Sequence, residues 1–163
     1  MIDKQQLEQL YQYSYSLTTN NADAYDLLQS ALEKYLQKSL SHVNNKMAYI
    51  RQIIRNQFID NQRRLNKVSF EVLEDSDTIA IDTIQLDDLM IAQDKISIIW
   101  KIMNASEREI IYLWGVEGFS AKQISIETGI ARGTILSKIH RLREKILTKF
   151  SHLEQVVSSR GKQ

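Results

Sequence analysis

Residues 120–143 read SAKQISIETGIARGTILSKIHRLR, and this stretch predicts two helices joined by a tight turn. Ser120 and Gln123 have the spacing of a capping box, which begins a helix. Gly129 suits the left-handed residue that closes this helix, and a second, longer helix follows from about Arg132. Apolar residues at helical spacing would form a small core between the two helices: Ile124, Ile130, Ile135, Ile139 and Leu142.

The second helix, which would run to about Phe150, exposes small and hydrogen-bonding residues over its first turns. These residues are Arg132, Gly133, Thr134, Ser137, Lys138, His140 and Arg141. Side chains of these types bind phosphates and base edges, and a glycine lets a phosphate approach the backbone closely. The pattern therefore predicts a DNA-binding helix-turn-helix. The alternative is a helical hairpin with a solvated basic face.

The rest of the 163-residue chain also has a helical pattern. Proline is absent and the first of the five glycines is Gly115, so the main helix breakers are missing before that point. We therefore predict an all-α fold. The expected helices besides those of the motif are Asp3 to Leu17, Ala22 to Ser39, Lys46 to Asn66, one from about Leu86, and Ser106 to Trp114 with a Ser106–Glu109 capping box. The expected core stripes comprise Leu7, Leu10, Tyr11, Ser14, Tyr25, Leu28, Leu32, Tyr35, Leu36, Met47, Ile50, Ile54, Phe58, Leu89, Ile96, Ile99, Met103, Trp100 and Trp114.

The net charge of +1 conceals three strongly charged segments. Residues 41–67 carry six basic residues and one acidic residue, or +5, and residues 120–150 carry seven basic and two acidic residues, again +5. Between them, residues 68–94 carry eight acidic residues and no basic one. Two basic blocks on predicted helices favour nucleic acid as a partner, although cations at a helix end can also cap it. We predict two small helical domains, residues 1–67 and 86–155. An acidic linker, residues 68–85, would join them, and a disordered tail, residues 156–163, would follow.

Several classes of function are disfavoured by what the sequence lacks. There is no cysteine, no run of 18 apolar residues and no basic start followed by an apolar segment. The expectation is a cytoplasmic protein without membrane insertion. The three histidines are far apart, and no phosphate-binding glycine loop or nucleophile–base pair is present before Gly115. We expect no metal, no cofactor, no catalytic residues and hence no enzyme.

The C-terminal motif resembles region 4 of the sigma factors of bacterial RNA polymerase, in particular the small extracytoplasmic-function (ECF) group of the sigma-70 family. Three stretches carry the resemblance: Glu117 to Ser125, Gly133 to Ile135, and His140 to Arg143. Residues 105–109 are similar to the segment that leads into region 4. Leu136 stands where the family commonly has Arg or Lys.

The N-terminal half resembles region 2 of the same family. Asp23 to Gln29, which reads DAYDLLQ, is similar to one of its motifs, and Ser30 stands where an acid commonly follows. Tyr49–Ile50, Ile54 to Asn56, Asp60 and Arg63–Arg64 are similar to the next motif. The resemblance covers residues 20–67 and 86–150. Region 4 alone occurs in other regulators, whereas both halves in this order are much more specific.

The resemblance implies three binding surfaces and no bond chemistry. The clamp helices of the polymerase core would be bound by Asp23, Asp26, Leu27, Gln29 and Glu33. The −10 promoter element would be engaged and melted by Asn44, Asn45, Lys46, Arg51, Arg55, Asn56, Arg63 and Arg64, with Tyr49 able to stack on a base. The exposed residues of the helix-turn-helix would read the −35 duplex. The implied partners are the polymerase core with its clamp helices and flap, promoter DNA, and an anti-sigma factor as a further partner.

Two other functions remain open at this point. The chain could be an autonomous helix-turn-helix regulator whose N-terminal half senses a signal or dimerises. It could also be a sigma-like adaptor that binds polymerase without opening DNA. The similarity of the N-terminal half to region 2 argues against the first of these.

Overall fold

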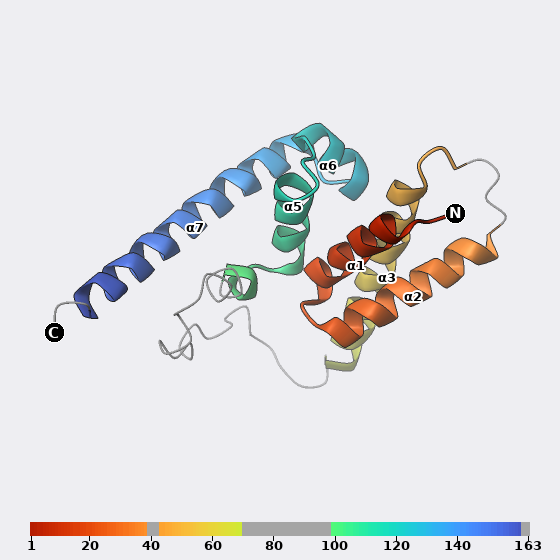
Figure 1. The fold of residues 1–163 in the computed structure, drawn as a ribbon, viewed down its shortest axis with the longest axis horizontal. Helices are drawn as coiled ribbons and strands as arrows, with labels where there is room; N and C mark the ends of the chain where they lie inside the picture. The colour runs from red at the N-terminus through yellow and green to blue at the C-terminus, as the bar shows by residue number, and fades with distance from the viewer. Residues whose placement is uncertain (39–42, 70–98, 161–163) are drawn as a thin grey trace. The chain divides into compact units, whose positions relative to one another are not determined.

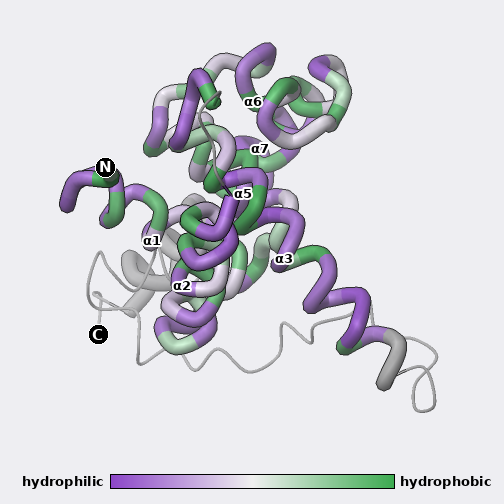
Figure 2. Tube along the Cα trace, turned by 90° about the vertical axis from the view of Figure 1, so that its right-hand side faces the viewer, coloured by the Kyte–Doolittle hydropathy of each residue, from purple (hydrophilic) through white to green (hydrophobic). Residues whose placement is uncertain are grey.

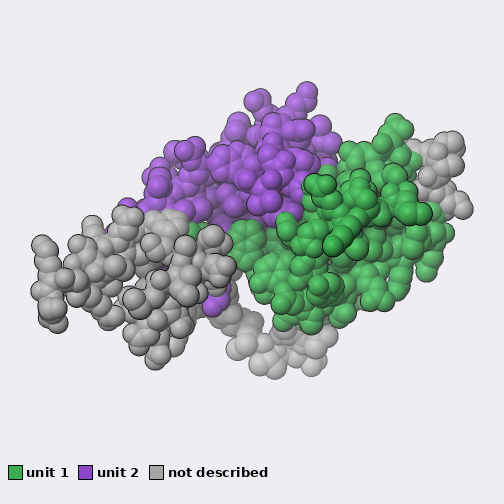
Figure 3. Space-filling view, in the orientation of Figure 1, with its two compact units in different colours: residues 1–100 green, residues 101–163 purple. Residues whose placement is uncertain are grey.

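The computed structural model describes residues 1–38, 43–69 and 99–160 (Figure 1). These residues form α-helices and contain no strand, which confirms the predicted all-α class. The chain divides into two compact units, Met1–Trp100 and Lys101–Gln163 (Figure 3). Along the helices, hydrophobic and hydrophilic residues alternate as expected for amphipathic segments (Figure 2).

Unit 1 is built on three helices, each of which packs against the other two. They are α1 (Lys4–Thr18), α2 (Asn21–Gln37) and α3 (Lys46–Ser69). Caps define the junction between α1 and α2: Thr19 closes α1 with φ of 57°, and the side chain of Asn20 accepts from the Asp23 amide at 3.1 Å. The predicted helices are therefore present, and their ends differ from the predicted ones by up to three residues.

The core of unit 1 contains only part of the predicted apolar stripes. Leu10, Leu28, Ile50 and Ile54 are buried as expected, and Ser14 is buried with its hydroxyl donating to the Leu10 carbonyl. The prediction is wrong for three exposed side chains: Leu7, Tyr25 and Leu36. For Tyr25 and Leu36, the reason is that the side of α2 facing the bundle carries Ala24, Leu27, Leu28 and Ala31 instead.

One buried hydrogen bond joins α2 to α3. The Gln57 side-chain amide donates to the Ser30 hydroxyl at 2.7 Å, and Gln57 is buried. The other side-chain atom of Gln57, Oε1, is buried without a hydrogen-bond partner. Ser30 therefore accepts a hydrogen bond inside the bundle. This gives a structural role to the serine that stands where an acid is common in the family.

Unit 2 is built on α5 (Ala105–Gly115), α6 (Ala121–Thr128) and α7 (Arg132–Arg160). The predicted Ser106–Glu109 capping box is wrong by two residues, because Asn104 is the N-cap and its partner is Glu107. Glu109 is buried and cannot reach back to the helix start. Residues 99–102, which precede α5, are also helical.

The core of unit 2 agrees more closely with the sequence. Met103, Ile124, Ile135, Ile139 and Leu142 are buried, as predicted. Ile99, which belongs to unit 1, is also buried as predicted. Trp114 is exposed, contrary to the prediction, because the buried arc of α5 consists of Glu109, Ile110, Tyr112 and Leu113.

The predicted linker and tail are described only in part. Val68 and Ser69 extend α3, whereas residues 70–98, with most of the predicted linker and the candidates Leu89 and Ile96, lie outside the described residues. The tail prediction is wrong for residues 156–160, since α7 continues to Arg160. No glycine or proline occurs between Gly133 and Gly161 to interrupt it. Over the described parts of the chain, no helix has the length and apolar character needed to cross a membrane.

Replacing Ser30 with alanine should lower the free energy of unfolding by about 1–3 kcal/mol, because the buried Gln57 amide loses its acceptor. Urea unfolding of the full chain, followed by circular dichroism, measures this change. Combining Ser30→Ala with Gln57→Leu should restore much of the loss, since both polar partners are then absent. A double variant that is less stable than Ser30→Ala alone would contradict this account.

Candidate nucleic-acid interface and partner groove

The predicted helix-turn-helix is formed by α6, a short turn and the start of α7. Ser120 caps α6, with its backbone amide donating to Gln123 Oε1 at 2.9 Å. Gly129 closes α6 in the left-handed conformation with φ of 73°. Thr128 tightens the same turn by donating to the Ile124 carbonyl and accepting from the Ile130 amide. The turn is thus held by local hydrogen bonds that orient the first residues of α7.

Most of the predicted contact residues of α7 lie on its exposed face. Arg132, Gly133, Thr134, Ser137, His140 and Arg141 are all exposed. Two of them are also bonded along their own helix: Ser137 donates to the Gly133 carbonyl at 3.0 Å, and Arg141 Nε to the Ser137 carbonyl at 3.4 Å. The exposed face therefore combines donors, cations and one glycine over the first three turns of the helix.

Gly133 has no packing role inside unit 2. A Cβ built on it meets no atom within 4 Å, and its φ is not in the left-handed region. Glycine in a helix is less stable than alanine by roughly 0.5–1 kcal/mol, so the fold gains nothing from it here. The residue instead leaves the backbone of the first turn of α7 open to close approach from outside the chain.

Two lysines of the C-terminal basic block hold α7 against the preceding segment. Lys138 is half-buried and donates to Ser106 Oγ at 3.2 Å. Lys145 donates to the Ile102 carbonyl at 3.0 Å and lies 3.9 Å from a Glu107 carboxylate oxygen. Among the predicted contact residues of α7, Lys138 thus bonds to the segment before α7, whereas the bonds given above for Ser137 and Arg141 stay within α7.

The second predicted DNA surface lies on α3 and the segment before it. Asn44, Asn45, Lys46, Asn56, Arg63 and Arg64 are exposed, and Arg55 is half-buried. Asn45 also caps α3, since its Oδ1 accepts from the Ala48 amide at 3.0 Å. Arg63 lies 3.9 Å from Asp60, an exposed pair that leaves its charge available to solvent.

Arg51 does not belong to this exposed surface. Only 6% of it is exposed, because it shares the bundle-facing arc of α3 with Ile50 and Ile54. The sequence places Arg51 and Arg55 one turn apart, and we expected both to face DNA. The structure instead separates them, with Arg51 in the core and Arg55 at its edge.

An aromatic and cationic cluster lies where α2 ends and α3 begins. The rings of Tyr35 and Tyr49 are 6.4 Å apart between centroids and tilted by 55°. Lys38, at the end of α2, donates to the Tyr49 hydroxyl at 3.3 Å. Tyr35 and Lys38 are not predicted at this surface from sequence, because they lie 14 and 11 residues before Tyr49 and only the packing of the helices brings them to it.

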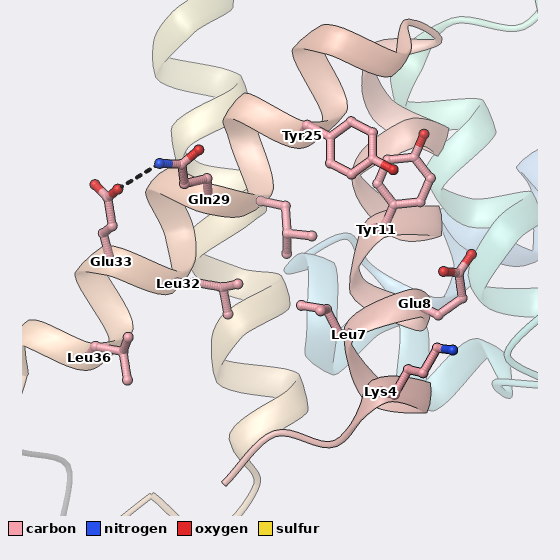
Figure 4. A pocket seen from close by; sticks show the side chains of 10 residues that line it. Lys4, Leu7, Glu8, Tyr11, Tyr25, Gln29, Leu32, Glu33 and Leu36 are labelled. Carbon is pink, nitrogen blue, oxygen red and sulfur yellow. Dashed lines mark hydrogen bonds between the residues drawn. The ribbon is translucent and has the colours of Figure 1, made fainter.

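A groove of about 470 Å³ runs between α1 and α2 (Figure 4). Its lining is largely apolar, with charged and amide groups along it: Lys4, Leu7, Glu8, Tyr11, Tyr25, Leu28, Gln29, Leu32, Glu33 and Leu36. Tyr25 is 60% exposed and Leu36 is 76% exposed. The sequence predicts Tyr25 and Leu36 as core residues, but the three-helix bundle does not cover them.

Local interactions fix the polar groups of this groove. The rings of Tyr11 and Tyr25 lie 4.5 Å apart between centroids, and the Tyr11 hydroxyl donates to Asn21 Oδ1 at 2.9 Å. Burial, followed by the neighbouring Tyr25, raises the pKa of Tyr11 above its usual 10.0, so the hydroxyl remains a neutral donor near pH 7. Gln29 donates to Glu33 at 3.1 Å, one turn away on α2 (Figure 4).

The residues predicted to bind polymerase divide into exposed and buried ones. Asp23, Asp26, Gln29 and Glu33 are exposed on α2, and the last two line the groove. Leu27 is buried in the bundle, which corrects its prediction as a contact residue. Its place on the helix explains this, because α2 turns Ala24, Leu28 and Leu27 toward α1 and α3. Within the described residues, no three histidine or acidic side chains cluster as metal ligands would.

Comparison with known proteins supports the resemblance. No family model matches the chain. The chain is similar to the ECF RNA polymerase sigma factor SigE of Mycolicibacterium smegmatis, with 25% identity over 155 residues that span 88% of this chain and 58% of SigE. It is also similar to the sigma factor RpoE of Bartonella quintana, solved with the anti-sigma factor NepR, at a TM-score of 0.68 and 27% identity over 90% of this chain and 92% of RpoE.

The chain is therefore similar in sequence and in fold to ECF sigma factors. The likeness to RpoE covers nearly all of both chains, so it includes both helical units of this chain. The chain spans only 58% of the length of SigE.

Replacing Gly133 with alanine should separate stability from DNA binding. The added methyl has open space, so we expect the free energy of unfolding to rise by roughly 0.5–1 kcal/mol. We expect duplex affinity to fall, because the methyl occupies the surface that a phosphate would approach. Urea unfolding and fluorescence anisotropy with duplex DNA measure the two effects. Gly115→Ala is the matched control, since Gly115 also has open space but lies at the end of α5; equal effects of both substitutions on DNA affinity would oppose this role.

Proposed function

We propose that this chain directs a bacterial RNA polymerase core to specific promoters and initiates transcription there. The observation that carries the proposal is that each of its two units has an exposed surface suited to DNA: the first turns of α7 in unit 2, and α3 with its preceding segment in unit 1. An autonomous helix-turn-helix regulator needs only the first surface. The similarity to sigma factors over both units supports the same function.

The start of α7 would bind the −35 duplex in the major groove. Its exposed cations Arg132 and Arg141 attract the phosphate backbone, while the free amides at the N-terminus of α7 add a favourable dipole. Thr134 and Ser137 have the size and donors to reach base edges or phosphates. Lys138 would keep its contact with Ser106 and support the helix.

The exposed face of α3 would bind the −10 element after its strands separate. Lys46, Arg63 and Arg64 provide positive charge for the backbone, and Asn56 can donate to and accept from a base edge. Tyr49, held between Tyr35 and Lys38, offers an aromatic surface on which a base can stack. No bond is made or broken in this step. Binding energy to the single strand offsets the cost of unpairing the bases.

The groove between α1 and α2 would dock on the polymerase core. Leu7, Tyr25 and Leu36 are exposed along it in the free chain, and two acidic residues line it, Glu8 and Glu33. Asp23 and Asp26 are also exposed on α2. A helix with apolar residues flanked by cations would complement this surface. The clamp helices of the polymerase are the proposed occupant, and an anti-sigma factor is a further proposed partner because the similar RpoE was solved with one.

Run-off transcription tests the proposed function directly. The full chain is added to core polymerase on a promoter library, and the expected result is initiation at a defined set of promoters. Absence of initiation on every promoter would overturn the proposal. Tight and selective duplex binding without core would favour the autonomous regulator, whereas polymerase binding without strand opening would favour the adaptor.

Replacing Leu36 with glutamate should weaken binding to core polymerase about tenfold or more, because it places a charge on an apolar contact. Leu36 is 76% exposed, so the fold should be retained. Anisotropy of the labelled full chain, titrated with core and without DNA, measures the affinity. The control is Leu147→Glu, because Leu147 is also an exposed leucine but lies on α7, away from the groove. Equal affinities of the two variants would show that the groove is not the docking surface.

Replacing Arg141 with alanine should weaken −35 binding by about 1–3 kcal/mol if its guanidinium reads a base, and the preference at one base pair should relax. A phosphate contact would instead weaken all sequences alike and reduce the dependence on salt. Competition with single-base variants of the −35 duplex, at two salt concentrations, separates these cases. Unchanged affinity under all conditions would exclude Arg141 from the interface.

A further inference from the structure

Leu136 is the large apolar side chain on the exposed face that α7 presents over its first three turns. It is 48% exposed, whereas Ile135 and Ile139 beside it are buried in unit 2. The fold therefore does not use Leu136 as a core residue. The leucine side chain has no hydrogen-bonding group, so it cannot bind a phosphate or the polar edge of a base. A contact of Leu136 with DNA would therefore have to be made to an apolar group.

The neighbours of Leu136 place it where base edges would lie. Arg132 is four residues before it and His140 four residues after it, so the three side chains form one stripe along the helix. Both neighbours are exposed and can hold phosphates or base edges on either side. In a duplex docked against this stripe, Leu136 would point into the major groove between two polar contacts.

The major groove offers one apolar group at its base edges, the 5-methyl group of thymine. We propose that Leu136 determines specificity by packing against a thymine methyl in the upstream promoter duplex. This inference rests on the proposed function, in which the start of α7 reads that duplex. A charged side chain at this position would bind phosphate or guanine. Leu136 would instead make an apolar contact that favours a T·A pair at one position.

The test removes the methyl group from the DNA and the leucine from the protein separately. Duplexes are first selected from a randomised upstream region with the full chain bound to core polymerase. Each thymine of the selected site is then replaced singly by deoxyuridine, which lacks the methyl group and keeps the hydrogen-bonding groups. Competition binding gives the ratio of the affinities for the thymine and uracil duplexes in each protein variant.

For the wild-type chain, we expect one thymine at which uracil weakens binding about fourfold, the factor associated with burying one methyl-sized group. In Leu136→Ala the ratio at that position should fall to about one, whereas Leu136→Met should retain most of it because methionine is similar in size and apolar. Leu147→Ala is the matched control: Leu147 lies 11 residues further along α7, about three turns on the same side, and is 59% exposed. It should leave the ratio unchanged.

The possible failures are distinguishable. If no duplex is selected, the proposed function fails and this inference fails with it. If duplexes are selected but uracil has no effect at any thymine, the proposed function stands and the role of Leu136 is overturned. A methyl effect that persists unchanged in Leu136→Ala also overturns it, because another side chain then makes the contact.

Discussion

Short helices in units of this size can bury only one arc of their circumference, and that constraint governs how this chain binds anything. In unit 1 the buried arc of α2 contains Ala24, Leu27, Leu28 and Ala31, which allows close packing against α1 and α3. The remaining arc still carries Tyr25 and Leu36, and these side chains stay exposed in the groove proposed to bind a partner. The same division on α7 leaves Leu136 facing outward while Ile135 and Ile139 form the core.

Charge is divided in a similar way between structure and binding. Lys138 and Lys145 are occupied in holding α7 to residues 102–107, and Arg51 lies inside unit 1. Other cations on α7 and α3 remain exposed, and these are the ones proposed to meet nucleic acid. Since burial and direct bonds remove cations from the exterior, the net charge of a basic segment overstates the charge that a duplex would meet.

The helix positions, the caps of α6 and the helix-turn-helix could be predicted from sequence because each depends on residues a few positions apart. Ser120 with Gln123, and Gly129 at the turn, are examples of such local signals. The predictions of burial and of side-chain neighbours fail where they depend on packing between helices. Periodicity cannot decide which of two adjacent apolar arcs on α2 faces the bundle, so Tyr25 and Leu36 were assigned to the core. Nor can it bring Lys38 and Tyr35 to Tyr49, or place Arg51 inside.

Gly133 also bears on how this sequence could change over generations. Because alanine fits at this position without strain, selection for thermal stability alone would favour its loss. If the start of α7 binds a duplex as proposed, such a chain would be more stable and would bind DNA less tightly. Thermal stability and promoter occupancy would then be opposing pressures on this one residue. Engineering efforts that rank variants by melting temperature would therefore discard the residue proposed to allow close approach to DNA.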